Sequence, residues 1–216
     1  MAQKFAVSGQ HYLFDVQAFA HTILALGGEE YSYALRDRTT RGVISDVVEG
    51  RSEVGVLMRN TRTAADVDRE IEAAGLEFHE LATSKPRVAL PASHPLSNAT
   101  SLTPDQLADW PYVYFEQEDG APDYLAEEAL GDLPHAKSIA LTDRASLSEL
   151  AVAMNGYTFT SGILVGITDG GSLTTIPLES DVELSLGYVA RKGEALSPIA
   201  QRFVEKLAHS LELYAK

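Results

Sequence analysis

Apolar residues along the first third of the chain follow two alternating spacings. β-prone runs predict strands over residues 4–8, 31–35, 54–58 and 77–81. Between them, apolar residues three and four apart predict amphipathic helices. The helical stripes are Val16, Phe19, Ala20, Ile23 and Leu24, then Val43, Ile44, Val47 and Val48, and a charged helix follows over 64–74. Strands that alternate with helices at this rhythm predict right-handed βαβ units around a largely parallel sheet.

A second α/β series begins after residue 84. Strands are expected over 85–91, 112–115, 138–141, 157–160, 174–178 and 183–190. Helices are expected from the Thr103-Pro104 cap through Leu107, over Asp123 to Leu130, after a capping box at Ser146 to Glu149, and from Ser197-Pro198 to the end. Gly156 ends the third of these helices. The chain therefore carries two α/β units.

Charge and composition restrict the kinds of partner and site. The chain has 17 Lys and Arg residues and 31 Asp and Glu residues, which gives a net charge of −14. This charge argues against polyanion binding by the chain. Cysteine is absent, so disulfides and thiolate metal sites are excluded. No apolar run approaches the roughly 20 residues that span a bilayer. The N-terminus lacks a basic and then apolar leader, so we expect a cytoplasmic protein that contacts no membrane.

Ordered motifs across nearly the whole chain carry a family resemblance. They are Val48-Glu-Gly-Arg-Ser-Glu-Val-Gly-Val56, Ser93-His-Pro-Leu96, Leu102-Thr-Pro-Asp-Gln-Leu107, Asp143-Arg-Ala-Ser146, Met154-Asn-Gly-Tyr157 and Gly187-Tyr-Val-Ala-Arg-Lys-Gly193. In this order and spacing the sequence resembles the effector-binding domain of LysR-type bacterial transcriptional regulators. The winged helix-turn-helix of that family has no counterpart in these residues, so the chain is similar to the sensor half alone.

The resemblance implies an α/β fold of two Rossmann-like subdomains joined by two crossover strands, as in type 2 periplasmic binding proteins. The first subdomain would comprise residues 1–86 and 187–216, and the second residues 87–186. A small effector would bind in the cleft between them. The family also implies a homodimer, with a tetramer as the alternative for a full-length regulator, and promoter DNA as a partner only through the helix-turn-helix domain. The stripes at Val43/Val47 and Leu150/Met154 are candidate dimer surfaces, unless they face their own sheets.

Ligands of open α/β sheets bind beyond the carboxyl ends of the strands, and this rule selects the candidate site. The residues it selects are Ser8, Gln10, His11, Thr39, Thr40, Arg59, Asn60, Glu116, Gln117, Asp143, Arg144, Thr160 and Ser161. Their hydroxyls, amides and charges suit a small carboxylate or zwitterion, with Arg144 holding the carboxylate. Simpler roles compete, because the Ser and Thr residues also suit helix caps, and Asp143 suits either a cap or a pair with Arg144.

Catalytic motifs are missing from the sequence. It contains no G-x-S-x-G, G-x-G-x-x-G, P-loop or H-E-x-x-H pattern, and its six His are scattered. We therefore expect no enzyme activity, no metal and no cofactor. Two alternatives remain open. A transport-type solute-binding protein shares the fold, and an arogenate- or prephenate-handling enzyme would need Glu116 or Asp143 as a catalytic acid.

Overall fold

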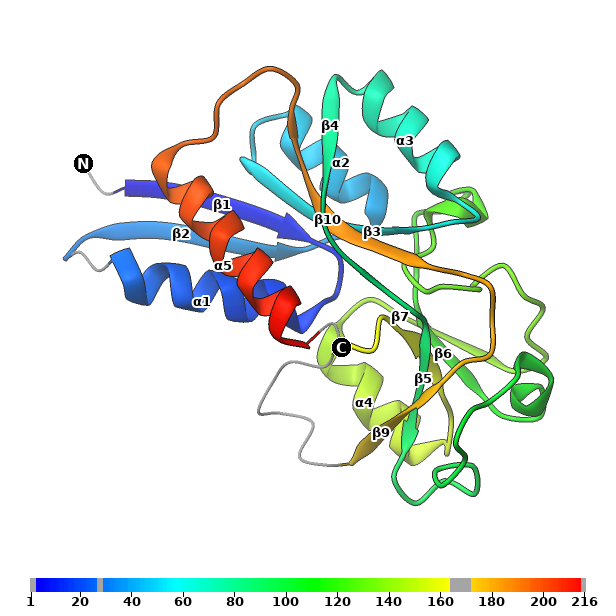
Figure 1. Ribbon diagram of the computed structural model, residues 1–216. Helices are drawn as coiled ribbons and strands as arrows, with labels where there is room; N and C mark the ends of the chain where they lie inside the picture. The colour runs from blue at the N-terminus through cyan, green and yellow to red at the C-terminus, as the bar shows by residue number, and fades with distance from the viewer. Residues whose placement is uncertain (1–2, 27–28, 164–171, 215–216) are drawn as a thin grey trace.

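A five-stranded sheet, here called the large sheet, forms one half of the protein (Figure 1). The computed structural model describes residues 3–26, 29–163 and 172–214. The strand order is β2-β1-β3-β10-β4. The strands are β1 (Gln3–Gly9), β2 (Tyr31–Asp37), β3 (Val54–Asn60), β4 (Leu76–Ser84) and β10 (Leu184–Arg191). β1 pairs in parallel with β2 and β3, as predicted, whereas β10 is antiparallel to β3 and β4.

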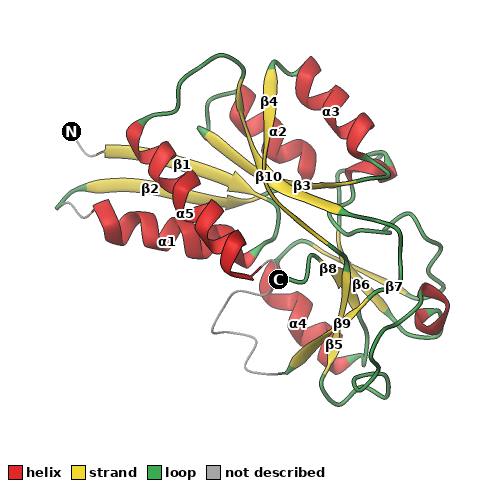
Figure 2. Cartoon of the chain, viewed as in Figure 1, coloured by secondary structure: helices red, strands yellow, loops and turns green. Residues whose placement is uncertain are grey.

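Helices cover both faces of the large sheet (Figure 2). They are α1 (Leu13–Leu26) and α5 (Pro198–Tyr214) on one face, and α2 (Thr40–Val48) and α3 (Ala64–Ala73) on the other. Side chains of β3 alternate between the two cores: Val56 belongs to the core that contains Phe203, and Leu57 to the core that contains Val43. A strand that is buried on both faces needs a continuous apolar run, which explains the sequence of β3.

The other half contains two shorter sheets, here called the small sheets. One has the order β8-β5-β9 and the other pairs β6 with β7. Their strands are β5 (Arg87–Pro91), β6 (Tyr112–Phe115), β7 (Ser138–Leu141), β8 (Thr158–Thr160) and β9 (Leu173–Pro177). A bridge between Tyr112 and Tyr157 connects the two. This half also contains α4 (Arg144–Ala153) and the 3-10 turns η1 (Pro104–Leu107) and η2 (Asp123–Leu125).

The two halves are joined where β4 leads to β5 and where the chain returns from β9 to β10. β4 and β10 are hydrogen-bonded to each other, so both connections lie side by side. Their register shifts between Leu186 and Gly187. A Cβ at Gly187 would lie 2.1 Å from the His79 carbonyl oxygen, so this close approach of two backbones requires glycine.

Two predicted helix faces need correction. In α1, Val16 and Leu24 are 37% and 80% exposed, whereas Phe14 and Ala18 are buried. The helix is confirmed, but the predicted stripe points partly to solvent because α5 packs on a neighbouring face. In α2, Val43 and Val47 are buried against the large sheet, so of the two roles left open for this stripe they face their own sheet and do not form a dimer surface.

Two predictions of local structure in the second half are also wrong. The helix expected over 123–130 is only the short turn η2, and Leu130 has a φ of +62°, which no α-helix accommodates. The capping box expected at Ser146 lies inside α4, whose N-cap is Asp143: the Ser146 N–H donates to its carboxylate at 2.9 Å. A cap by Asp143 is one of the simpler roles that the sequence allows.

Candidate functional site

A cavity of about 480 Å³ lies between the large sheet and the small sheets. His11, Tyr12, Leu13 and Met58 line it from the large-sheet half. The other half contributes Ala89, Phe115, Glu127, Glu128, Ala129, Arg144, Ala145, Leu147, Ser148, Glu149, Thr158, Phe159, Thr160, Ser161, Ile163 and Leu173. Most of these side chains are apolar. The cavity is therefore an apolar space with a few charged groups, a composition typical of small-molecule sites.

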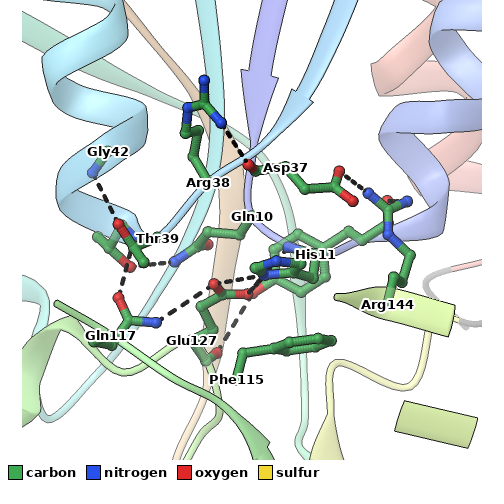
Figure 3. A network of polar contacts seen from close by, with 12 residues as sticks. Gln10, His11, Asp37, Arg38, Thr39, Gly42, Phe115, Gln117, Glu127 and Arg144 are labelled. Atoms are coloured by element: carbon green, nitrogen blue, oxygen red, sulfur yellow. Dashed lines mark hydrogen bonds and ion pairs between the residues drawn. The ribbon is translucent and has the colours of Figure 1, made fainter. Parts of the chain in front are cut away.

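His11 and Glu127 form an ion pair that connects the two halves (Figure 3). The His11 Nδ1 lies 2.9 Å from Glu127 Oε1, and the His11 backbone N–H donates to Oε2 at 3.0 Å. Both side chains are buried, and the imidazole stacks on Phe115 with 4.0 Å between ring centroids. Burial opposes protonation, but the hydrogen bond and the charge of Glu127 outweigh it and raise the pKa of His11.

Glu128 is a second buried acid beside this pair. Its Oε1 accepts the Phe115 backbone N–H at 2.7 Å, and its Oε2 has no hydrogen-bond partner among the described residues. Burial raises the pKa of Glu128 to about 8, and the neighbouring charge of Glu127 contributes to the shift. Glu128 therefore holds its proton at neutral pH when the cavity contains no cation.

Arg144 makes the other charged connection between the halves. It is the first residue of α4, and its Nη1 donates to the Tyr12 carbonyl oxygen at 2.7 Å. Its Nη2 bonds the Asp37 carboxylate at the end of β2 (Figure 3). The Asp15 carboxylate lies 3.8 Å from Nη1. Arg144 thus joins α4 to three groups of the large-sheet half.

Asp15 is buried beneath this arginine in the first turn of α1. It is fully inaccessible to solvent, and neither carboxylate oxygen has a hydrogen-bond partner among the described residues. Burial raises the pKa of Asp15 to about 7; the nearby Asp37 adds to this rise and Arg144 opposes it. A titratable acid therefore lies directly behind the connection between the halves.

Four residues selected from the sequence lie together on the cavity wall: His11, Arg144, Thr160 and Ser161. Thr160 ends β8 and Ser161 follows it. Ser161 is buried, and its Oγ accepts the backbone N–H of Ile163 at 3.3 Å. These four residues come from the ends of three different elements, as the strand-end rule predicts.

Four more candidates lie at the ends of β1 and β2 but outside the cavity lining. The Ser8 hydroxyl donates to the buried Asp46 at 2.6 Å. The Gln10 side chain accepts the Met58 N–H at 2.7 Å and donates to the Thr40 hydroxyl at 2.5 Å. Thr39 caps α2 through the Gly42 N–H. Thr39 thus takes the helix-capping role that the sequence also allows, and the polar atoms of Ser8, Gln10 and Thr40 are bonded within the fold.

The remaining candidates do not line the cavity, although Gln117 bonds a residue that does. The Arg59 guanidinium bonds Asp68 and lies 4.2 Å from the Phe78 ring centroid, and Asn60 accepts the N–H groups of the following turn. Glu116 is exposed. Gln117 accepts the Thr40 N–H at 3.2 Å and donates to Glu127 at 3.4 Å (Figure 3). Asp143 bonds Ser146 and does not pair with Arg144.

Sequence reasoning missed the acids and aromatic rings of the cavity. Glu127 and Glu128 belong to the segment expected to be helical, where adjacent acids indicate a solvated face. In the sequence, Phe115 and Phe159 are indistinguishable from other apolar residues of the predicted strands. One signal was present, because two acids sit among Ala126, Ala129 and Leu130, which are apolar.

No helix of the described residues has both the length and the apolar character needed to cross a membrane. Across residues 3–26, 29–163 and 172–214, no three His, Cys, Asp or Glu side chains are grouped so that they could hold a metal ion.

Comparison with known proteins identifies the family. The model of the LysR substrate binding domain matches residues 31–212. The chain belongs to this family. The match includes both halves of the structure and the residues around the cavity from Met58 to Leu173. No curated protein matches the sequence as a relative.

Solved structures of LysR regulators share the fold. The effector binding domain of QuiR in complex with shikimate has a TM-score of 0.65 at 10% identity, and the match covers 100% of both chains. The regulatory domain of MetR from N. meningitidis has a TM-score of 0.66 at 9% identity, with 99% of this chain and 95% of that chain covered. HinK from Pseudomonas aeruginosa has 0.65 at 16% identity, with 98% of this chain and 70% of that chain covered. The predicted α/β class and its likeness to periplasmic binding proteins are confirmed.

Proposed function

We propose that the cavity between the large sheet and the small sheets is the effector site of a LysR-type sensor. The observation that carries this proposal is that both halves line one mainly apolar cavity at the carboxyl ends of strands. Binding there touches both halves at once. A ligand with more contacts in the closed arrangement favours that arrangement by its differential affinity.

The moving parts would be two lobes, residues 1–86 with 187–216, and residues 87–186. The paired strands β4 and β10 connect them and act as the hinge. The ion pair of His11 with Glu127 and the contacts of Arg144 with Tyr12 and Asp37 hold the lobes together. Since these contacts border the cavity, an effector that enters it changes the balance between closed and open forms.

The effector would be a small carboxylate or zwitterion, and the geometry favours the zwitterion. Arg144 is the group that would hold a carboxylate, but its guanidinium already bonds Asp37. At the start of α4, the Ser146 N–H is already bonded to the Asp143 carboxylate. A simple carboxylate would have to displace one of these acids, whereas a zwitterion also brings a positive group to an acidic cavity.

Sensing would reach DNA only through a helix-turn-helix domain in the same regulator, acting in the cytoplasm as a homodimer or tetramer. The family is one of regulatory domains, so neither catalysis by Glu116 or Asp143 nor transport of a solute is favoured.

A thermal-shift screen over amino acids, organic acids and sugars tests the proposal. A ligand at a hundred times its Kd stabilises the fold by about 2.7 kcal/mol. Thr160→Trp fills the cavity and should abolish the shift. Thr174→Trp, on β9 but outside the cavity lining, is the matched control and should retain it. An undiminished shift in Thr160→Trp would place the ligand elsewhere and refute the proposal.

A further inference from the structure

Glu128 is a buried acid on the cavity wall, and only one of its two carboxylate oxygens is hydrogen-bonded to the protein. It is 6% exposed, and only Oε1 has a hydrogen-bond partner among the described residues, the Phe115 N–H. A buried polar atom without a partner is unfavourable, and such atoms in native proteins call for an explanation. Oε2 has almost no accessible surface in the free protein, so a ligand that supplies a donor to it must turn the carboxylate toward the cavity as it binds.

The other charged groups of the cavity already have partners. His11 pairs with Glu127, and Arg144 bonds Asp37 and the Tyr12 carbonyl oxygen. Among the described lining residues, each positive group thus has an acid of the protein beside it, whereas no cation of the protein pairs with Glu128. Glu128 is neutral while it holds its proton. Once ionised, it is an acid of this wall without a cation of the protein, and a cationic ligand is its natural complement.

Apolar and aromatic side chains supply the rest of the wall. Phe115 and Phe159 line the cavity together with Ile163 and Leu173. The Phe115 ring already stacks on the His11 imidazole, which is a cationic partner when protonated. Aromatic faces attract organic cations, and aliphatic side chains accept an apolar body.

On the basis of the proposed effector role, we propose that the effector carries a protonated amine on an apolar body. The Glu128 carboxylate receives the amine, and Phe115 and Phe159 contact the body. For a zwitterionic effector this assigns the positive end to Glu128 and leaves the carboxylate for the side of Arg144. For a simple amine, Glu128 is the main polar contact.

If the Glu128 carboxylate binds the amine, ligand binding releases the proton that Glu128 holds in the free protein. Burial and the charge of Glu127 raise the pKa of Glu128 to about 8, so its O–H bond must break before the carboxylate pairs with the amine. The proton passes to the buffer, and the amine keeps its own. With a pKa of about 8, competition by this proton weakens binding about 50-fold at pH 6 relative to pH 8. Affinity therefore rises with pH over this interval.

Other titratable groups line the cavity or lie close to the residues that do, and they need a control. They are Glu127, His11 and Tyr12, Tyr112 on β6, Asp15 on α1, and Arg144 and Glu149 on α4. Glu128→Gln removes the titration of Glu128 and leaves all the others in place. Its amide oxygen still accepts the Phe115 N–H, so the variant is expected to fold, which a thermal melt checks. The difference between wild type and variant isolates Glu128.

The experiment is isothermal titration calorimetry of the whole chain at pH 6, 7 and 8. The probes are matched pairs with one apolar body each: 2-phenylethylamine with 3-phenylpropionate, and hexylamine with hexanoate. We expect the amines to bind, more weakly at pH 6, with about one proton released per ligand at the lower pH values. Glu128→Gln should weaken amine binding at least about tenfold and remove its share of the pH dependence. Glu212→Gln removes an exposed acid of α5 outside the cavity lining and should leave affinity nearly unchanged.

Several outcomes would overturn the assignment. They are tighter binding of the carboxylates, binding by no amine, and equal amine affinity in Glu128→Gln and wild type. Glu128 also lines a second cavity of about 270 Å³, so loss of amine binding in Ser138→Trp, which fills that cavity, would count against it as well. Failure of the proposed function gives a different result. If ligands bind outside the cavity, any probe that binds has the same affinity for Thr160→Trp as for the wild type.

Discussion

Arg144→Ala tests whether this arginine connects the two halves or serves only a ligand. A residue that touched only the ligand would leave the melting temperature of the free protein unchanged. Arg144 is instead largely buried and joins α4 to the large-sheet half through the Tyr12 carbonyl oxygen, Asp37 and the nearby Asp15. Its removal therefore costs stability without any ligand present.

The size of the loss follows from the separate contacts. The charged hydrogen bond to Tyr12 is worth about 1.5–3 kcal/mol. The pair with Asp37, which is partly exposed, adds at most about 1 kcal/mol. Asp15 adds little at pH 7, because its pKa of about 7 rises further without the arginine and the acid takes up a proton. The sum is about 2–4 kcal/mol, or roughly 5–15 °C in melting temperature for a chain of this size.

Differential scanning calorimetry without ligand, at pH 7, measures the effect. The matched control is Arg69→Ala, because the pair of Arg69 with Asp66 in α3 is exposed and spaced three residues apart. We expect its melting temperature to change by less than about 2 °C. If the two variants melt within about 2 °C of each other, Arg144 does not hold the halves together and the reasoning is wrong.

Three further predictions concern pH, self-association and DNA. The pKa of Asp15, raised by burial to about 7, means that the folded chain binds a proton that the unfolded chain has lost, so stability falls as pH rises from about 4 to 7. Asp15→Asn should flatten the curve of unfolding free energy from urea titrations by about 1.4 kcal/mol per unit between about pH 5 and 6, and parallel curves would contradict this. The chain should form a homodimer that Met154→Asp weakens. The reason is that Val48 on α2, Val152 on α4 and Met154 at the C-cap of α4 are exposed apolar side chains. Sedimentation velocity that finds the wild type monomeric at high concentration would count against this prediction. With a net charge of −14, the chain alone should give no specific complex with promoter DNA in a low-salt gel shift, and a retarded specific band would show otherwise.

The sequence predicts the strands better than the segments between them. β6 and β7 begin and end at the predicted residues. Both are short runs of mainly apolar residues with clear limits, and β6 is largely buried. The segment after η2 has a helix-forming composition, but Glu127 and Glu128 turn inward to His11 and to the Phe115 N–H. Such contacts between distant parts of the chain override local propensity.

The candidate site was also only partly predictable from the sequence, because its side chains depend on contacts between distant parts of the chain. The rule of strand ends locates the right loops, since it selects His11 and Arg144. It does not say which side chain of a loop faces the ligand: Gln10 turns to the Met58 N–H, whereas the next residue, His11, faces the cavity. The raised pKa of Glu128 depends on burial and on Glu127, and both follow only from the packed structure.

Because of the position of β10, the large sheet can be completed only late in the synthesis of this chain. β10 lies between β3 and β4 and pairs with both, so neither strand has its partner on this side until residues 184–191 have been synthesised. A nascent chain that ends earlier exposes unpaired backbone groups on both strands, and open strand edges recruit other chains. β10, the last strand in the order of the described residues, is the one that joins the two parts of the sheet, and chains shortened before Leu184 should aggregate rather than fold.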